Sequence, residues 1–260
     1  MTFPAHATAM SEASGPMGPK DADWSFDRFV AVGYGVVYDY VFERFAPYRA
    51  LRAEVLRYVE SAAAGVRDRR AWHVLDIGCG PGNFTLAIGE AGFTVVGVDP
   101  FGALVDLARE KRRTRHLPNV SFKHAEAVVA EPRWRGAFDQ VVNVHGLYAH
   151  PAPHELLRGA WEALKPGGHA LFVNFSRRVP LLGTFTDLRR REGLGSALRA
   201  LRWVLPNAVF ESTRRRLAPP NYWQMDEFQA HLAAAGFAVL DIHRTFFDGV
   251  SLLAWVQKTQ

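Results

Sequence analysis

The sequence predicts an α/β protein, in which helices cover both faces of a parallel sheet. From residue 73 onward, short apolar runs alternate with amphipathic helical segments. The first run leads into a glycine-rich turn, and the second ends in an acidic residue. Continuous apolar strands separated by helices are typical of parallel sheets that are buried on both faces.

The composition is that of a folded protein with a sizeable core. Of the 260 residues, 48% are hydrophobic and 22% are charged, which excludes disorder as the main state. The single cysteine, Cys79, excludes a disulfide framework and a multi-cysteine zinc site. No run approaches the roughly 20 apolar residues of a membrane span, and the N-terminus does not resemble a secretory signal. We therefore expect a cytoplasmic protein without a transmembrane segment.

The charge balance is only modestly basic. The formal net charge is +5, and much of the arginine lies in three short runs: 112–113, 189–191 and 214–216. This pattern favours solvated arginine-rich helix faces over a nucleic-acid partner.

The parts before the first strand differ in character. Residues 1–22 are rich in Ala, Ser, Gly and Pro and predict a disordered leader. Residues 23–70 predict a helical N-terminal cap. Within it Leu51, Val55 and Val59 recur at a spacing of four, so they lie on one helix face.

Residues 71–176 predict the core of the fold. Its five predicted strands are 73–78, 93–99, 119–125, 138–145 and 169–175. The turn Lys165–Gly168 is expected to end a helix and lead into the fifth strand, because Pro and Gly both stop helices.

The remainder divides into two parts. Residues 177–222 are arginine-rich and punctuated by proline, and they predict a helical insertion or lid. Residues 223–260 predict a helix that ends at Gly236, followed by two strands at 237–244 and 249–258.

The glycine turn predicts a ligand site. Asp76, Gly78, Cys79 and Gly80 lie between the first strand and a helix, in the pattern D-x-G-x-G-x-G. A dinucleotide fingerprint would need glycine where Asn83 stands, and a phosphate loop would need a lysine after the glycines. The pattern better suits a ligand that carries no phosphate.

Two acids follow at strand ends. Asp99 ends the second strand about twenty residues after the turn, where a ribose-binding acid is expected; the alternative is that it only caps the next helix. Glu126 follows the third strand and could accept a hydrogen bond from an adenine amine, a weak signal by itself.

Together these residues resemble class I S-adenosylmethionine-dependent methyltransferases over about residues 71–176. The resemblance implies a Rossmann-like seven-stranded sheet whose last strand is antiparallel, with S-adenosyl-L-methionine as cofactor. It places Gly78 and Gly80 against the methionine moiety, Asp99 on the ribose and Pro100 on the adenine. The full predicted cofactor set is Asp76, Gly78, Cys79, Gly80, Asp99, Pro100, Glu126, Ala127 and Asn143.

Other segments match the family in part. Ala125 replaces the glycine of its G-D-A segment, whereas Leu164–Gly168 matches its L-K-P-G-G turn closely. Leu147–Pro151 matches L-H-H-V-P, but Tyr148 and Ala149 replace the two histidines. Any role of those histidines therefore does not carry over.

Methyl transfer from a sulfonium is an in-line displacement, so holding the acceptor in place can supply about 7–11 kcal/mol of the barrier reduction. A base is needed only if the acceptor must lose a proton. His145, directly after the fourth strand, is our candidate base, and the alternative is that it packs in the pocket wall. The predicted acceptor residues are Tyr34, Tyr38, Tyr148, His150 and Phe175.

Several acceptor classes lose support. After the fourth strand the chain lacks the Asn/Asp-Pro-Pro-Tyr/Phe segment of amine methylation, and Pro219–Tyr222 has another order and lies elsewhere in the chain. Cys79 lies in the cofactor turn, which argues against cytosine carbon-5 methylation, and prolines separate His150 from His154, so no metal site is expected.

We therefore predict a small organic or lipid-like acceptor under an aromatic lid. The lid residues are Trp24, Phe26, Tyr34, Phe42, Trp203, Phe210 and Trp223, and the alternative for each of them is ordinary packing of the cap against the core. The alternatives are a catalytically silent cofactor-binding protein of the same fold and an RNA methyltransferase. The acceptor atom and the oligomeric state are not predicted.

Overall fold

The computed structural model describes residues 42–43, 45–125, 132–178, 185–186, 189–191, 193–195, 197–198 and 220–259. The predicted leader, most of the predicted N-terminal cap and most of the predicted insertion lie outside these ranges. Among the predicted site residues, Tyr34, Tyr38, Glu126 and Ala127 also lie outside them.

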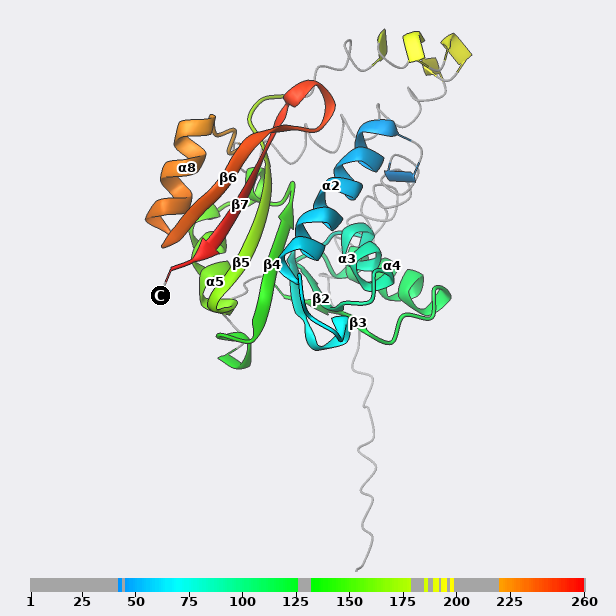
Figure 1. The fold of residues 1–260 in the computed structure, drawn as a ribbon. Helices are drawn as coiled ribbons and strands as arrows, with labels where there is room; N and C mark the ends of the chain where they lie inside the picture. Colours follow the sequence, from blue (N-terminus) through cyan, green and yellow to red (C-terminus); the bar gives the residue numbers. More distant parts are fainter. Residues whose placement is uncertain are drawn as a thin grey trace, which may run out of the picture.

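One seven-stranded sheet organises the molecule (Figure 1). Its strands are β1 His73–Ile77, β2 Thr94–Asp99, β3 Val120–His124, β4 Phe138–Val144, β5 Leu164–Phe175, β6 Phe237–Thr245 and β7 Ser251–Lys258. The spatial order is β3-β2-β1-β4-β5-β7-β6. The first five strands pair in parallel, whereas β7 is antiparallel to both β5 and β6. The predicted fold class is thereby confirmed.

Helices cover both faces of this sheet, as Figure 1 shows. The helices are α2 Ala46–Ala62, α3 Asn83–Glu90, α4 Gly102–Thr114, α5 Pro153–Ala163 and α8 Met225–Ala234. Helices α2, α3 and α4 lie on one face, and α5 and α8 lie on the other. Short 3-10 turns are η1 Arg69–Ala71, η3 Pro132–Trp134, η4 Leu147–Ala149 and η5 Phe247–Gly249. None of the helices in the described ranges is long and apolar enough to cross a bilayer.

Helix α2 confirms the predicted apolar face, since Leu51, Val55 and Val59 are all buried against the sheet. Hydrogen bonds between polar side chains connect the same helix to the edge strand β6. Glu54 lies 3.0 Å from the His243 Nε2 atom, and its other oxygen accepts a 2.5 Å hydrogen bond from Thr245. These contacts fix the position of α2, whose first turn reaches the carboxyl edge of the sheet.

The fifth strand begins earlier than expected. The structure ends α5 at Ala163 and starts β5 at Leu164, which pairs with Phe138 of β4. The register then shifts, so that the next pair joins Gln140 to His169. Gly167 has a φ of 73°, which glycine adopts without strain, and this allows the Pro-Gly-Gly turn to bulge within the strand.

Candidate active site

The glycine turn lies at the edge where the parallel strands end. The backbone N–H groups of Gly78 and Cys79 both donate to the Val98 carbonyl, at 2.8 and 3.0 Å. The turn after β1 is thus held directly against the end of β2. The carboxyl ends of adjacent parallel strands are the usual place for a ligand in such sheets.

Gly82 closes the turn under tight steric limits. Its φ is 80°, and a Cβ atom there would lie 2.7 Å from the ring of Phe122 and 2.9 Å from the Cβ of Ala108. Strand β3 and helix α4 therefore support the turn from below. Only glycine fits this position without displacing the support.

Asp99 accepts hydrogen bonds on both carboxylate oxygens. Gly80 N–H donates to one at 2.8 Å, and Phe101 N–H donates to the other at 2.9 Å. Burial raises the pKa of Asp99, although these two bonds act in the opposite direction. A carboxylate has about four acceptor positions, so two remain for a ligand's hydroxyl groups. The N-cap of α4 is Phe101, so Asp99 braces the turn before that helix and does not cap it.

Asp76 is a buried acid next to the same turn. The Thr85 hydroxyl of α3 donates a 2.5 Å hydrogen bond to its carboxylate. Burial raises the pKa of Asp76 to about 7, against the effect of this bond. A nearby cationic ligand group would favour its charged form. The sequence analysis did not single out Thr85, although it lies in the helix that the turn begins.

Asn143 connects the ends of two strands. Its side-chain amide donates to the Ile77 carbonyl at 2.7 Å and accepts from the Leu147 N–H at 3.2 Å. A Cβ on Gly146 would lie 2.3 Å from this amide, so the close approach depends on that glycine. Because Asn143 is fully buried, its side chain shapes the edge of the site.

Two further predicted cofactor residues lie at the same edge. The Cys79 side chain is buried beside Leu86 and Phe122, and burial raises the pKa of its thiol. Its side chain therefore packs in the core beneath the turn, and only its backbone can face a ligand. Pro100 is exposed, and the ring of the next residue, Phe101, is 51% exposed. An exposed aromatic ring beside Asp99 suits stacking on a flat ligand group.

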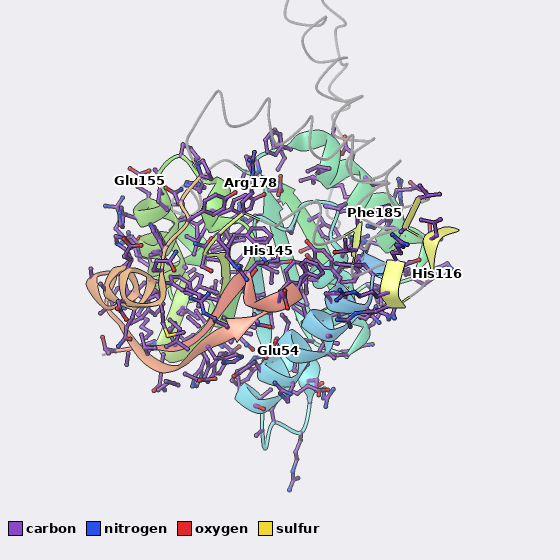
Figure 2. The ribbon with its side chains drawn as sticks, turned by 90° about the horizontal axis from the view of Figure 1, so that it is seen from above. Glu54, His116, His145, Glu155, Arg178 and Phe185 are labelled. Atoms are coloured by element: carbon purple, nitrogen blue, oxygen red, sulfur yellow. The ribbon has the colours of Figure 1, made fainter. Side chains whose placement is uncertain are left out.

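His145 follows β4 in a left-handed conformation, with a φ of 56°. Its ring stacks on Phe175 at a centroid distance of 3.9 Å, and its Nε2 atom lies 2.9 Å from the Ser251 hydroxyl. Burial lowers the pKa of His145 to about 3, so the imidazole is neutral at pH 7. Figure 2, seen from above, shows His145 near the middle of the molecule, whereas His116 and Glu155 lie towards its periphery.

Aromatic rings from several elements surround His145. Tyr48 of α2 and Phe246 of the β6–β7 turn meet it nearly edge-on, with centroids 6.2 and 5.1 Å away. Tyr148 packs edge-on against Phe175 at 4.8 Å. We call these five residues the aromatic wall. The structure thus brings together three residues predicted for this side of the site, His145, Tyr148 and Phe175.

Asn221 joins the segment before α8 to the loop after β4. Its side-chain amide donates to the Leu147 and His150 carbonyls, at 3.2 and 2.8 Å, and its N–H donates to the Tyr148 carbonyl. Asn221 and Tyr222 are therefore close to the site in space, although they are distant from it in the chain. The Asn221 amide is bonded to backbone, so it is not free to contact an acceptor as in amine methylation.

Other predicted residues have structural contacts. The His150 ring accepts from the Ala152 N–H at 3.1 Å and stabilises the turn before α5. Trp223, expected in the lid, instead packs with Phe228 and His231 in the core beneath α8, so its lid assignment is wrong. Phe42 is buried and meets Phe84 edge-on beside the glycine turn.

Known proteins resemble this chain in sequence and in fold. The family described as "Methyltransferase domain" matches residues 42–242, well over half of the chain. The curated relatives include ubiquinone biosynthesis O-methyltransferases from Acinetobacter baylyi, 24% identical over 51% of this chain and 55% of the relative, and from Shewanella halifaxensis, 30% identical over 52% and 56%. The chain thus spans about half the length of these relatives.

A solved structure shows the likeness of fold. Magnesium protoporphyrin IX methyltransferase from Synechocystis, with bound SAH, matches with a TM-score of 0.59 and 16% identity, covering 91% of this chain and 94% of that one. The family match is consistent with the structure, which has a Rossmann-like sheet and a glycine turn after β1, with an acid at the end of β2. The chain belongs to the methyltransferase-domain family.

Proposed function

We propose that this chain is an S-adenosylmethionine-dependent methyltransferase and that it acts on a small organic or lipid-like acceptor, which binds against the aromatic wall. The observation that carries the proposal is the set of rings around His145, contributed by α2, β5, the loop after β4 and the β6–β7 turn. Such a surface suits a flat or apolar molecule, since it offers apolar area and ring faces with few polar groups.

The names of the curated relatives support this class of acceptor. They describe O-methyltransferases of ubiquinone biosynthesis, and the match covers about half of their length. An oxygen acceptor is therefore our first choice. The expected cytoplasmic location stays a prediction.

The cofactor residues fit S-adenosylmethionine by their chemistry. In this proposal the ribose hydroxyls donate to the two free acceptor positions of Asp99, and the amino group of the methionine moiety draws Asp76 into its charged form. The glycine turn leaves backbone groups open to close approach, and Phe101 covers the adenine. The bound cofactor supplies an electrophilic methyl group; the protein supplies position.

His145 as a general base stays a prediction, and its environment favours another role. A ring with a pKa of about 3 is a weak proton acceptor. It is nevertheless a neutral group with hydrogen-bonding capacity in an apolar wall, so it can orient the polar group of an acceptor.

One arginine run on α4 has partners within the protein. Arg113 pairs with Glu110, and Arg112 donates to the Val120 carbonyl at 3.2 Å. Arg113 nevertheless stays largely exposed, and residues 189–191 are exposed as well, so the transfer assay below tests the RNA alternative.

The test is a binding measurement followed by a transfer assay. Calorimetry should detect binding of S-adenosylmethionine and of its demethylated product. Methyl-labelled cofactor should then label phenols or lipid extracts in preference to RNA. Cofactor binding without transfer to any acceptor would favour the catalytically silent alternative, and labelled RNA would favour the RNA alternative.

A further inference from the structure

Ser251 lies beside His145 in the structure, although no sequence motif marks it. Ser251 begins β7, is fully buried, and pairs with Phe175 in the antiparallel β5–β7 register. Its hydroxyl lies 2.9 Å from the Nε2 atom of His145, across 106 residues of sequence. The imidazole is therefore held in its plane by Phe175 stacking and along one edge by Ser251.

The other ring nitrogen of His145 is in a different situation. The Nδ1 atom is buried and has no hydrogen-bond partner in the described part of the chain. Buried polar atoms are nearly always bonded, and an unbonded one in a native site needs an explanation. The backbone of His145 is also held at a φ of 56°, which a non-glycine residue adopts at a cost. Its contacts with β5 and β7 maintain this costly arrangement.

The proton of the neutral ring is best placed on Nε2. A ring N–H has a fixed direction, so an unbonded Nδ1–H would remain an orphan donor among aromatic rings. With the proton on Nε2, that donor bonds to the Ser251 oxygen, whose own hydroxyl hydrogen rotates about the C–O bond and has no fixed direction. Nδ1 then carries a lone pair.

We infer that Ser251 is a positioning residue of the methyl-transfer site: it holds the proton of His145 on Nε2, so that Nδ1 accepts a hydrogen bond from the hydroxyl or amine of the acceptor. The inference rests on the proposed function. An acceptor bound in this way has its nucleophilic lone pair oriented before the methyl group arrives.

The first experiment measures the ring directly and needs no acceptor. Nitrogen NMR of histidine-labelled protein, with His145 assigned by a His145→Gln variant, should show a protonated Nε2 and an unprotonated Nδ1. Ser251→Ala should mix the two tautomers, and Ser251→Thr, which keeps the hydroxyl, should restore the native signals. A native ring protonated on Nδ1, or signals unchanged in Ser251→Ala, would overturn the inference.

The second experiment measures methyl transfer to catechol, a small phenol, or to the acceptor that the transfer assay described above identifies. Ser251→Ala removes the hydrogen bond that orients the His145 ring, so it should lower kcat about tenfold, with unchanged affinity for S-adenosylmethionine. Ser251→Thr should recover most of the rate.

Ser176→Ala is the matched control. Ser176 is also buried near the end of β5, but its hydroxyl donates to the Val250 carbonyl and accepts from Arg244, not from His145. It should keep kcat and the native histidine signals, and melting temperatures would show that both serine variants fold. Native transfer that Ser251→Ala leaves unchanged overturns only this inference. Cofactor binding without transfer by the native chain overturns the proposed function instead.

Discussion

The two halves of the carboxyl edge are built in different ways. The half that we propose for the cofactor, the cofactor half, is polar and local: Asp76, the glycine turn and Asp99 lie within 24 residues, and much of its structure is backbone hydrogen bonding. The half that we propose for the acceptor, the acceptor half, is aromatic and assembled from distant segments, from Tyr48 to Phe246. A turn held by backbone bonds tolerates few changes of residue, whereas a wall of side-chain rings can change one ring at a time.

Burial affects the two halves in opposite directions. It raises the pKa of Asp76 to about 7 and lowers the pKa of His145 to about 3. In both cases the neutral form is favoured, because an uncharged group loses less on leaving water. The comparison therefore predicts different responses to mutation and to pH.

The largest effect is expected for Asp99→Ala. It removes the acid of the cofactor half and leaves the Gly80 N–H without its acceptor. Loss of two charge-assisted hydrogen bonds should weaken cofactor binding by on the order of 10³-fold, about 4 kcal/mol. Calorimetry checks this result, with Asp106→Ala, which loses only an exposed pair with Arg109, as control. Equal affinity in the two variants would remove Asp99 from the cofactor site.

The pH dependence of stability should separate the halves. Between pH 4 and 7 the unfolded chain has released the Asp76 proton while the folded chain retains it, so this residue lowers stability as pH rises, by up to on the order of 4 kcal/mol. His145 acts oppositely: between pH 3 and 6.5 only the unfolded chain binds its proton, so stability rises with pH.

Single variants should reveal these opposed slopes. The free energy of unfolding, measured with urea, should rise more steeply with pH between 4 and 6.5 in Asp76→Asn than in the native chain, because the opposing contribution of Asp76 is gone. In His145→Gln the free energy of unfolding should fall more steeply with pH over the same window. Parallel profiles for all three proteins would contradict the burial argument for both residues.

Gly82→Ala should destabilise the fold by about 2 kcal/mol. The new Cβ meets Phe122 and Ala108 at less than 3.0 Å and also occupies a left-handed backbone position. Gly136→Ala is the matched control, since its φ is 64° but a Cβ there meets nothing within 4 Å. Thermal melting should show a clearly larger loss for Gly82→Ala. Equal losses of stability would mean that the left-handed backbone alone requires glycine at this position, and that the contacts with Phe122 and Ala108 do not.

The smallest effect is expected for Phe246→Leu in the acceptor half. Removing one ring contact from the aromatic wall should lower kcat/KM for the acceptor by about fivefold, or about 1 kcal/mol, with unchanged cofactor affinity. Steady-state kinetics with each substrate varied in turn checks this split. A change in cofactor affinity of the same size would place Phe246 in both halves.

The sequence by itself determined the strand–turn–helix framework on which we propose that the cofactor binds. Its strand–turn–helix pattern, the glycines and Asp99 carry a local signal, because a tight turn and a strand end require particular residues at fixed spacing. The same locality made the buried face of α2 predictable from Leu51, Val55 and Val59.

The sequence named His145, Tyr148 and Phe175 of the acceptor half, but only the tertiary structure decided which further residues join them. Ser251 meets His145 across 106 residues, and Asn221 reaches the loop after β4 from the segment before α8. The placement of Trp223 in the core instead of the lid likewise depends on how α8 packs against α5. Contacts of this kind leave no periodicity or spacing in the chain, because they arise from the order in which strands join the sheet.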